Sequence, residues 1–118
     1  MQQELELLFA SQLDIAVRAG RIPPYVTQWR GIPNRKHRFD FAWPNWKLTC
    51  EVQGGTWMPN RSGHSTGIGL QRGYEKQSLA AIHGIYTMAC DSTQIRKGIA
   101  LKWVIQFFKE RGFNVYNW

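Results

Sequence analysis

Two acidic residues in a short apolar segment are the first candidates for chemistry. Asp40 and Glu51 lie within residues 38–53, RFDFAWPNWKLTCEVQ, in a chain of 118 residues that holds only eight Asp and Glu. Side chains alternate between the two faces of a strand. If the segment forms a hairpin with its turn at 45–46, Asp40 falls directly opposite Glu51. Like charges placed in this way destabilise a strand pair, because their Cβ atoms are only about 4.5–5.5 Å apart.

A divalent cation between the two carboxylates would remove the repulsion. Magnesium is held by one or two carboxylates, with water and substrate phosphate completing its shell. The pattern therefore predicts a metal-dependent phosphodiesterase site at Asp40 and Glu51. Two alternatives stay open at this point. Each carboxylate can pair with an arginine or lysine, Arg38 being the nearest, or one of the two can be protonated.

The same hairpin register sets the positions of its other side chains. It places Phe41 opposite Cys50 and Arg38 opposite Gln53. Alternation along the first strand predicts that Phe39 and Phe41 share one face. The second strand is expected to separate an apolar face from a polar face that carries its acidic residue.

Hydrophobic periodicity and turn residues predict the elements that position these residues. They are a helix over 3–19 ended by Gly20, a strand over 26–29, the hairpin over 38–53, a helix over 70–83, a strand over 85–90, a helix over 93–111 and an edge strand over 113–118. Apolar stripes are expected on the first helix at Leu5, Leu8, Phe9, Leu13 and Ala16, and on the last at Ala100, Trp103, Val104, Phe107 and Phe108. The order α-β-β-β-α-β-α-β predicts a single α/β domain over 1–118, with a mixed central sheet flanked by helices.

Composition narrows the class of protein. With 43% hydrophobic residues the chain is expected to be globular, and its formal charge of +7 favours a polyanionic partner such as nucleic acid. Cys50 and Cys90 show no CxxC spacing, so buried free thiols are expected rather than a disulfide framework or a zinc site. The start of the chain lacks a signal-peptide pattern, and no apolar run approaches the roughly 18 residues of a membrane span. These features predict a cytoplasmic protein that does not bind a membrane.

A family resemblance rests on the combination of these residues with the element order. Asp40, then Glu51-Val52-Gln53 on the next strand, then a helix with Tyr74-Glu75-Lys76, resembles the PD-(D/E)XK nuclease superfamily and its small single-domain phage and bacterial members. The resemblance covers most of the chain. It implies a restriction-endonuclease-like core and an endonuclease that uses Mg²⁺ or Mn²⁺ to cut DNA. It further implies that Asp40, Glu51 and the backbone carbonyl of Val52 hold the metal.

The chain departs from the family pattern at two positions. Phe39 stands where the family name has proline, at a variable position, and Gln53 occupies the usual lysine position. Because a glutamine amide can orient water but carries no charge, another cation is needed, and some relatives supply it from the following helix. Lys76 is the candidate, with a solvated helix lysine beside Glu75 as the alternative. In relatives an acid on the first helix can complete the metal site, which makes Glu6 a further candidate or else an ordinary surface glutamate.

Basic residues on both sides of the acidic pair are the candidates for contact with nucleic acid. They are Arg35, Lys36, Arg38 and Arg72, together with Arg61 and His64 in a glycine-rich loop suited to holding phosphate. A chain of this size offers little surface for reading a long sequence, so cutting at junctions, flaps or nicks is expected. A homodimer would place two sites on two strands. Two other functions stay open, an inactive nucleic-acid-binding module of the same fold and a phage-type inhibitor domain that binds an acidic protein.

Overall fold

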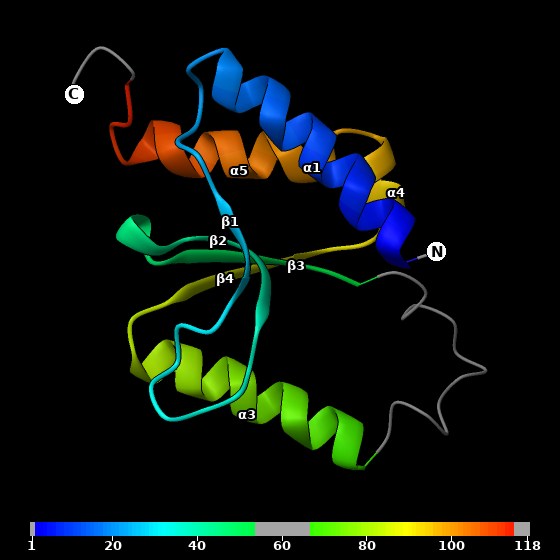
Figure 1. Ribbon diagram of the computed structural model, residues 1–118, viewed down its shortest axis with the longest axis vertical. Coiled ribbons are helices and arrows are strands. Elements are labelled where there is room, and N and C mark those ends of the chain that lie inside the picture. Colours follow the sequence, from blue (N-terminus) through cyan, green and yellow to red (C-terminus); the bar gives the residue numbers. More distant parts are fainter. Residues whose placement is uncertain (1, 54–66, 115–118) are drawn as a thin grey trace.

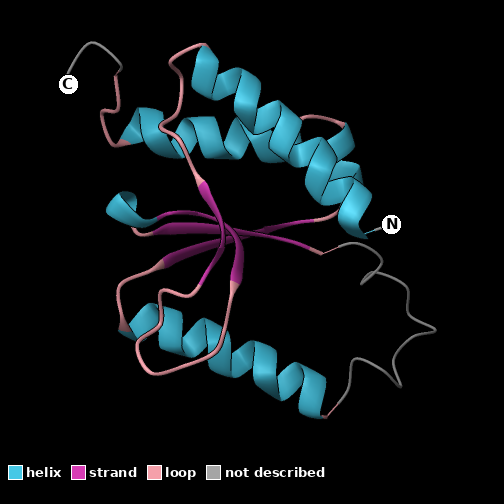
Figure 2. Ribbon diagram, in the orientation of Figure 1, coloured by secondary structure: helices cyan, strands magenta, loops and turns pink. Residues whose placement is uncertain are grey.

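A four-stranded mixed sheet forms the middle layer of the protein, and helices cover both of its faces (Figure 1, Figure 2). The computed structural model describes residues 2–53 and 67–114. The elements are α1 (Gln2–Arg18), β1 (Val26–Trp29), β2 (Phe39–Trp43), the 3₁₀ turn η1 (Pro44–Trp46), β3 (Leu48–Val52), α3 (Ile68–Ile82), β4 (Tyr86–Cys90), α4 (Ser92–Arg96) and α5 (Ile99–Glu110). Helix α3 lies on one face of the sheet, and α1, α4 and α5 lie on the other.

The strands follow one another across the sheet in the order β1-β2-β3-β4. The pairs β1–β2 and β2–β3 are antiparallel, and β3–β4 is parallel. Parallel neighbours need a crossover connection, and α3 is the helix of that crossover. The predicted α/β class, with a mixed sheet flanked by helices, is confirmed. Within residues 2–53 and 67–114, no helix is both long and apolar enough to cross a membrane.

The larger core lies between the sheet and the helices α1, α4 and α5. Its centre is built from Phe9 and Leu13 of α1, Phe41 of β2, Leu48 of β3 and Phe108 of α5, all of them 2% exposed or less. The stripe predicted on α1 is confirmed, with Leu8 only partly buried. On α5 the buried face is made by Ala100, Val104, Phe107 and Phe108. Trp103 was expected on that face but lies at its edge and is 39% exposed.

The helix predicted over 93–111 is two helices. α4 ends at Arg96 and α5 begins at Ile99, because Gly98 has a φ of 75°, a left-handed conformation that glycine adopts without a steric penalty. The predicted edge strand is wrong at 113–114, which are not extended into a strand. The rest of that prediction, 115–118, falls outside the described residues.

The two phenylalanines of β2 contact opposite helical layers, which contradicts the predicted shared face. Phe41 packs edge-to-face on Phe9 of α1, whereas Phe39 belongs to a smaller cluster with residues of α3. The β1–β2 pair departs from regular extended backbone between these two residues. Gln28, whose place in the register is opposite Asp40, has a φ of 53° and interrupts the extended backbone between the pairs at Thr27 and Trp29.

Candidate active site

Asp40 reaches from β2 to β3 with its carboxylate. Its Oδ2 accepts a hydrogen bond of 2.8 Å from the backbone N–H of Val52. This contact lies just beyond the Phe41–Cys50 pair, which has the predicted register. The N–H and C=O of one strand residue point to the same neighbouring strand, so the carbonyl oxygen of Val52 lies on the same side as Asp40. The carboxylate of Asp40 and the carbonyl oxygen of Val52, two of the predicted metal ligands, are therefore neighbours.

Glu51 turns toward α3, on the opposite face of β3 from the side chains of Cys50 and Val52. Its Oε1 accepts a hydrogen bond from Nζ of Lys76, which comes from the middle of α3. The two side chains are 20% and 21% exposed, so water screens this ion pair only in part. Lys76, which the sequence suggests as the cation missing at Gln53, therefore contacts Glu51 directly.

Lys76 is held in place by several contacts. Nζ also donates to the backbone carbonyl of Arg38 and lies 4.4 Å from the centre of the Phe39 ring. Burial lowers the pKa of Lys76, the charge of Asp40 acts in the opposite direction, and the charge of Arg38 lowers it further. A cation this close to two carboxylates and an aromatic face is not a solvated surface lysine, so that alternative is wrong.

The start of α1 lies near the end of β3 (Figure 1), and Gln2 there connects Glu6 to Val52. Nε2 of Gln2 donates to the carbonyl oxygen of Val52 at 2.6 Å and to Oε2 of Glu6 at 3.0 Å. One amide nitrogen therefore lies between two oxygen atoms that were predicted to hold a metal ion. A cation at the position of this nitrogen would meet both of them. Glu6 is half-buried, unlike an ordinary surface glutamate.

A cavity of about 250 Å³ opens beside the pair of Glu51 and Lys76. Its other walls are Phe39, Gln53, Gly73, Gln77, Thr87, Met88 and Ala89. Gln53 is thus on the wall of the cavity next to the acidic residue. The cavity gives a reacting group access to Glu51 and Lys76.

The donor atoms at this site fit a hard divalent cation in an open shell. Across 2–53 and 67–114, no three His, Cys, Asp or Glu side chains gather closely enough to hold a metal ion by themselves. Magnesium does not need such a cage, because it binds one or two carboxylates and fills its other positions with water and phosphate oxygens. The carboxylates of Asp40 and Glu51, with the carbonyl of Val52, provide oxygen ligands of this kind.

The basic residues predicted to bind nucleic acid are exposed where the structure describes them. Arg35, Lys36 and Arg38 precede β2, and Arg72 lies on the first half of α3. Arg61 and His64 fall outside the described residues. The sequence did not single out one further contact in this region. His37, in the loop before β2, lies 3.0 Å from Oε1 of Glu75 and ties this basic loop to α3.

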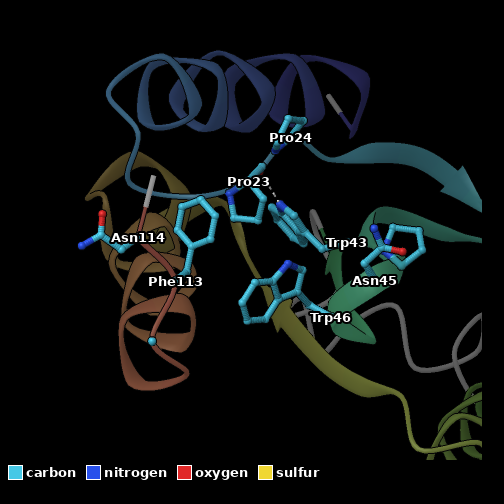
Figure 3. A pocket seen from close by; sticks show the side chains of 9 residues that line it. Pro23, Pro24, Trp43, Asn45, Trp46, Phe113 and Asn114 are labelled. Atoms are coloured by element: carbon cyan, nitrogen blue, oxygen red, sulfur yellow. Dashed lines mark hydrogen bonds between the residues drawn. The ribbon is translucent and has the colours of Figure 1, made fainter. Parts of the chain in front are cut away.

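A second cavity, of about 510 Å³, lies beside η1 and the end of α5, and Figure 3 shows the residues that line it. Its walls are Pro23, Pro24, Trp43, Pro44, Asn45, Trp46, Gly112, Phe113 and Asn114. Trp43 is fixed there by a hydrogen bond of 2.8 Å from its indole N–H to the carbonyl of Pro23. These described walls include no acidic or basic side chain, so this cavity lacks the groups for hydrolytic chemistry.

The two cysteines are buried free thiols, as the sequence predicts. Their sulfur atoms lie 3.9 Å apart on the neighbouring strands β3 and β4. The hydrogen bond to Cys90 and burial raise the pKa of Cys50. Its thiol therefore stays protonated at neutral pH and is not a candidate nucleophile.

We compared the chain with protein-family models, with curated proteins and with solved structures, and none of the three comparisons found a match. The functional interpretation therefore rests on the geometry of the site.

Proposed function

We propose that the protein is a nuclease of the PD-(D/E)XK type, with a restriction-endonuclease-like core, that hydrolyses phosphodiester bonds in DNA with Mg²⁺ or Mn²⁺. One observation carries the proposal. Asp40, Glu51 and Lys76 come from three separate elements, and their charged groups meet at one end of the sheet. Bringing two carboxylates and a partly buried ammonium group together costs free energy of desolvation, and such groupings are typical of functional sites.

In this proposal some side chains bind the metal ion and others stabilise charge on the substrate or orient water. Asp40, Glu51 and the carbonyl of Val52 hold the divalent ion, and Glu6 completes its shell through water. The ion, when bound, lowers the pKa of a water molecule and polarises the phosphate. Lys76 places its ammonium group beside the charge that develops on the phosphate oxygens. The amide of Gln53 orients the attacking water.

The proposed substrate follows from charge and size. Arg35, Lys36, Arg38 and Arg72 neutralise phosphates on either side of the cut, and Arg61 and His64 hold the strand. Phosphate contacts give affinity without sequence information, so a chain this small is expected to select DNA by its branched or nicked structure. We further propose a cytoplasmic location and a homodimer that presents one site to each strand.

Cleavage of defined DNA tests the proposal. Branched, nicked, single-stranded and duplex DNA are incubated with the protein and either Mg²⁺ or Mn²⁺. Glu51→Gln and Asp40→Asn keep the shape and one acceptor oxygen but remove the charge, so each is expected to lower the cleavage rate at least about 100-fold. Glu110→Gln, on the far face of the sheet, removes the same charge and serves as the control. Cleavage that persists without a divalent ion, or that Glu51→Gln leaves unchanged, would overturn the proposal.

A second candidate is a nucleic-acid-binding module without catalysis. Two observations favour it, because Lys76 already occupies Oε1 of Glu51 and Gln2 already occupies the carbonyl of Val52. In such a module these protein groups take the place of the metal ion. Salt-sensitive binding of DNA by the wild type, with no cutting of DNA or RNA in either metal, would identify this function.

A further inference from the structure

Gly73 lies inside α3 and lines the cavity beside Glu51 and Lys76. Glycine in a helix interior destabilises the helix relative to alanine, because it loses more backbone freedom on folding. A glycine at such a position is usually explained by a positive φ or by a close neighbour that leaves no room for a Cβ atom. Both explanations can be examined directly.

Neither explanation applies to Gly73. Its φ is not positive, in contrast with Gly67 just before the helix and Gly84 just after it. A Cβ atom built on Gly73 meets no described atom within 4 Å. The contrast with Gly31 is clear, because a Cβ atom there would fall 2.0 Å from the indole of Trp29. The missing side chain of Gly73 therefore has one effect in the described structure, which is to leave the cavity open.

The walls of this cavity combine three kinds of group. At one end are the charged groups of Glu51 and Lys76, which suit a phosphate and its metal ion. Phe39 contributes an apolar ring, and Met88 and Ala89 of β4 add apolar surface. The amide of Gln77 lies on a polar wall. Amides of this type form paired hydrogen bonds with the edges of nucleobases.

We propose that the cavity binds the nucleoside part of the nucleotide beside the cleaved phosphate, and that Gly73 sets the size of the ring that the cavity admits. This inference rests on the proposed nuclease function and specifies it. The phosphate lies at Glu51 and Lys76, and the sugar and base extend between Phe39 and β4 past Gly73. Because a Cβ atom at position 73 meets no described atom within 4 Å, we expect a larger side chain there to extend into this space and to leave the fold intact.

The test uses Gly73→Leu and compares it with Ala81→Leu, which adds a leucine at an exposed position of the same helix. Circular dichroism and thermal melting establish that both variants fold. Calorimetry with thymidine 5′-monophosphate and Mn²⁺ is expected to show affinity at least about tenfold weaker for Gly73→Leu and unchanged for Ala81→Leu. Steady-state cleavage is expected to show the same loss through a higher KM. Gly73→Ala is expected to melt at a higher temperature and to bind with intermediate affinity.

The results separate this inference from the proposed hydrolysis. If the wild type cleaves DNA and Gly73→Leu cleaves and binds as well as Ala81→Leu, the nucleoside site is wrong and the nuclease stands. If the wild type binds the nucleotide, Gly73→Leu does not, and neither cuts DNA, the nucleoside site stands and hydrolysis is wrong. A wild type that does not bind the nucleotide overturns the inference.

Discussion

Lys76 is subject to two opposing effects on its charge. Burial against Phe39 lowers its pKa, and the carboxylate of Asp40 acts against that shift. In the proposed mechanism Asp40 therefore has a second effect besides binding a metal ion, because its charge opposes the lowering of the Lys76 pKa by burial and by Arg38. In the proposed mechanism the lysine of α3 supplies the cation that Gln53, directly after β3, cannot supply.

Replacing Lys76 with methionine tests this role. Methionine keeps the apolar stem over Phe39 but removes the charge, so Lys76→Met is expected to fold and to lose about 10²–10³-fold in cleavage rate. Lys102→Met removes an exposed charge on α5 and is the control. Single-turnover cleavage kinetics give the comparison. Equal rates for both variants would show that Lys76 has no part in the reaction.

Tyr25 makes folding sensitive to high pH. Burial, followed by its hydrogen bond of 2.7 Å to Asp14 and the charge of that residue, raises the pKa of Tyr25 from 10.0 to about 12. The folded state therefore favours the neutral phenol. The stabilisation is complete below pH 10 and is lost as the pH rises from 10 towards 12. Urea unfolding across this window is expected to show a smaller decline for Tyr25→Phe. An equal decline in the variant would contradict the assignment.

Elements with strong local patterns were predicted closely from the sequence. Helix α1 and strand β1 begin and end within one residue of their predicted limits, because their apolar residues repeat at helix or strand spacing and Gly20 ends the helix. The hairpin register was also predicted. Pro44 and the apolar runs on both sides of the turn leave few other alignments that bury Phe41 and Cys50 on one face.

Features that depend on distant contacts or on one backbone angle were missed. The stripe of the final helix continues across Gly98, since Ile95 and Ala100 are both buried, so periodicity alone does not reveal the break. The change of face between Phe39 and Phe41 coincides with an irregularity in the β1–β2 pair, the left-handed φ of Gln28 opposite Asp40. The alternation of apolar and polar residues along β2 gives no information about the backbone conformation of β1.

Helix α4 has its own N-terminal capping box, formed by Asp91 and Gln94. Asp91 accepts a hydrogen bond of 2.9 Å from the N–H of Gln94, and the side chain of Gln94 accepts one of 3.0 Å from the N–H of Asp91. Asp91→Ala is expected to lower the free energy of unfolding by about 1 kcal/mol, measured in urea. Asp91→Asn keeps an acceptor and is the control. If both variants lose the same stability, the capping contact does not hold α4.

At the scale of the whole molecule, the two faces of the sheet differ in their contents. The face toward α1, α4 and α5 holds the larger core, and the face toward α3 holds a smaller cluster and the candidate site. The sequence identified the carboxylates Asp40 and Glu51 and the cation Lys76. It did not identify Gln2 or Gly73, because their positions at the site are set by how α1 and α3 dock on the sheet.

The net charge of +7 leads to a prediction about salt. The logarithm of the DNA-binding constant is expected to fall linearly with the logarithm of the salt concentration, with a slope of about −0.9 for each phosphate neutralised. Arg35→Ala, Lys36→Ala and Arg72→Ala are each expected to reduce that slope by about one. Fluorescence anisotropy at several salt concentrations measures it. Lys102→Ala, on the far face of the sheet, is expected to leave the slope unchanged. An equal effect of this variant would contradict the proposal that Arg35, Lys36 and Arg72 contact the DNA.

Calorimetric titration with Mn²⁺ tests the central claim most directly, because it needs neither a substrate nor turnover. The claim is that Asp40 and Glu51 hold one divalent ion together. The wild type and Glu110→Gln are expected to bind one ion, and Asp40→Asn and Glu51→Gln are expected to lose that binding while remaining folded. No binding by the wild type, or equal binding by all four proteins, would contradict the claim.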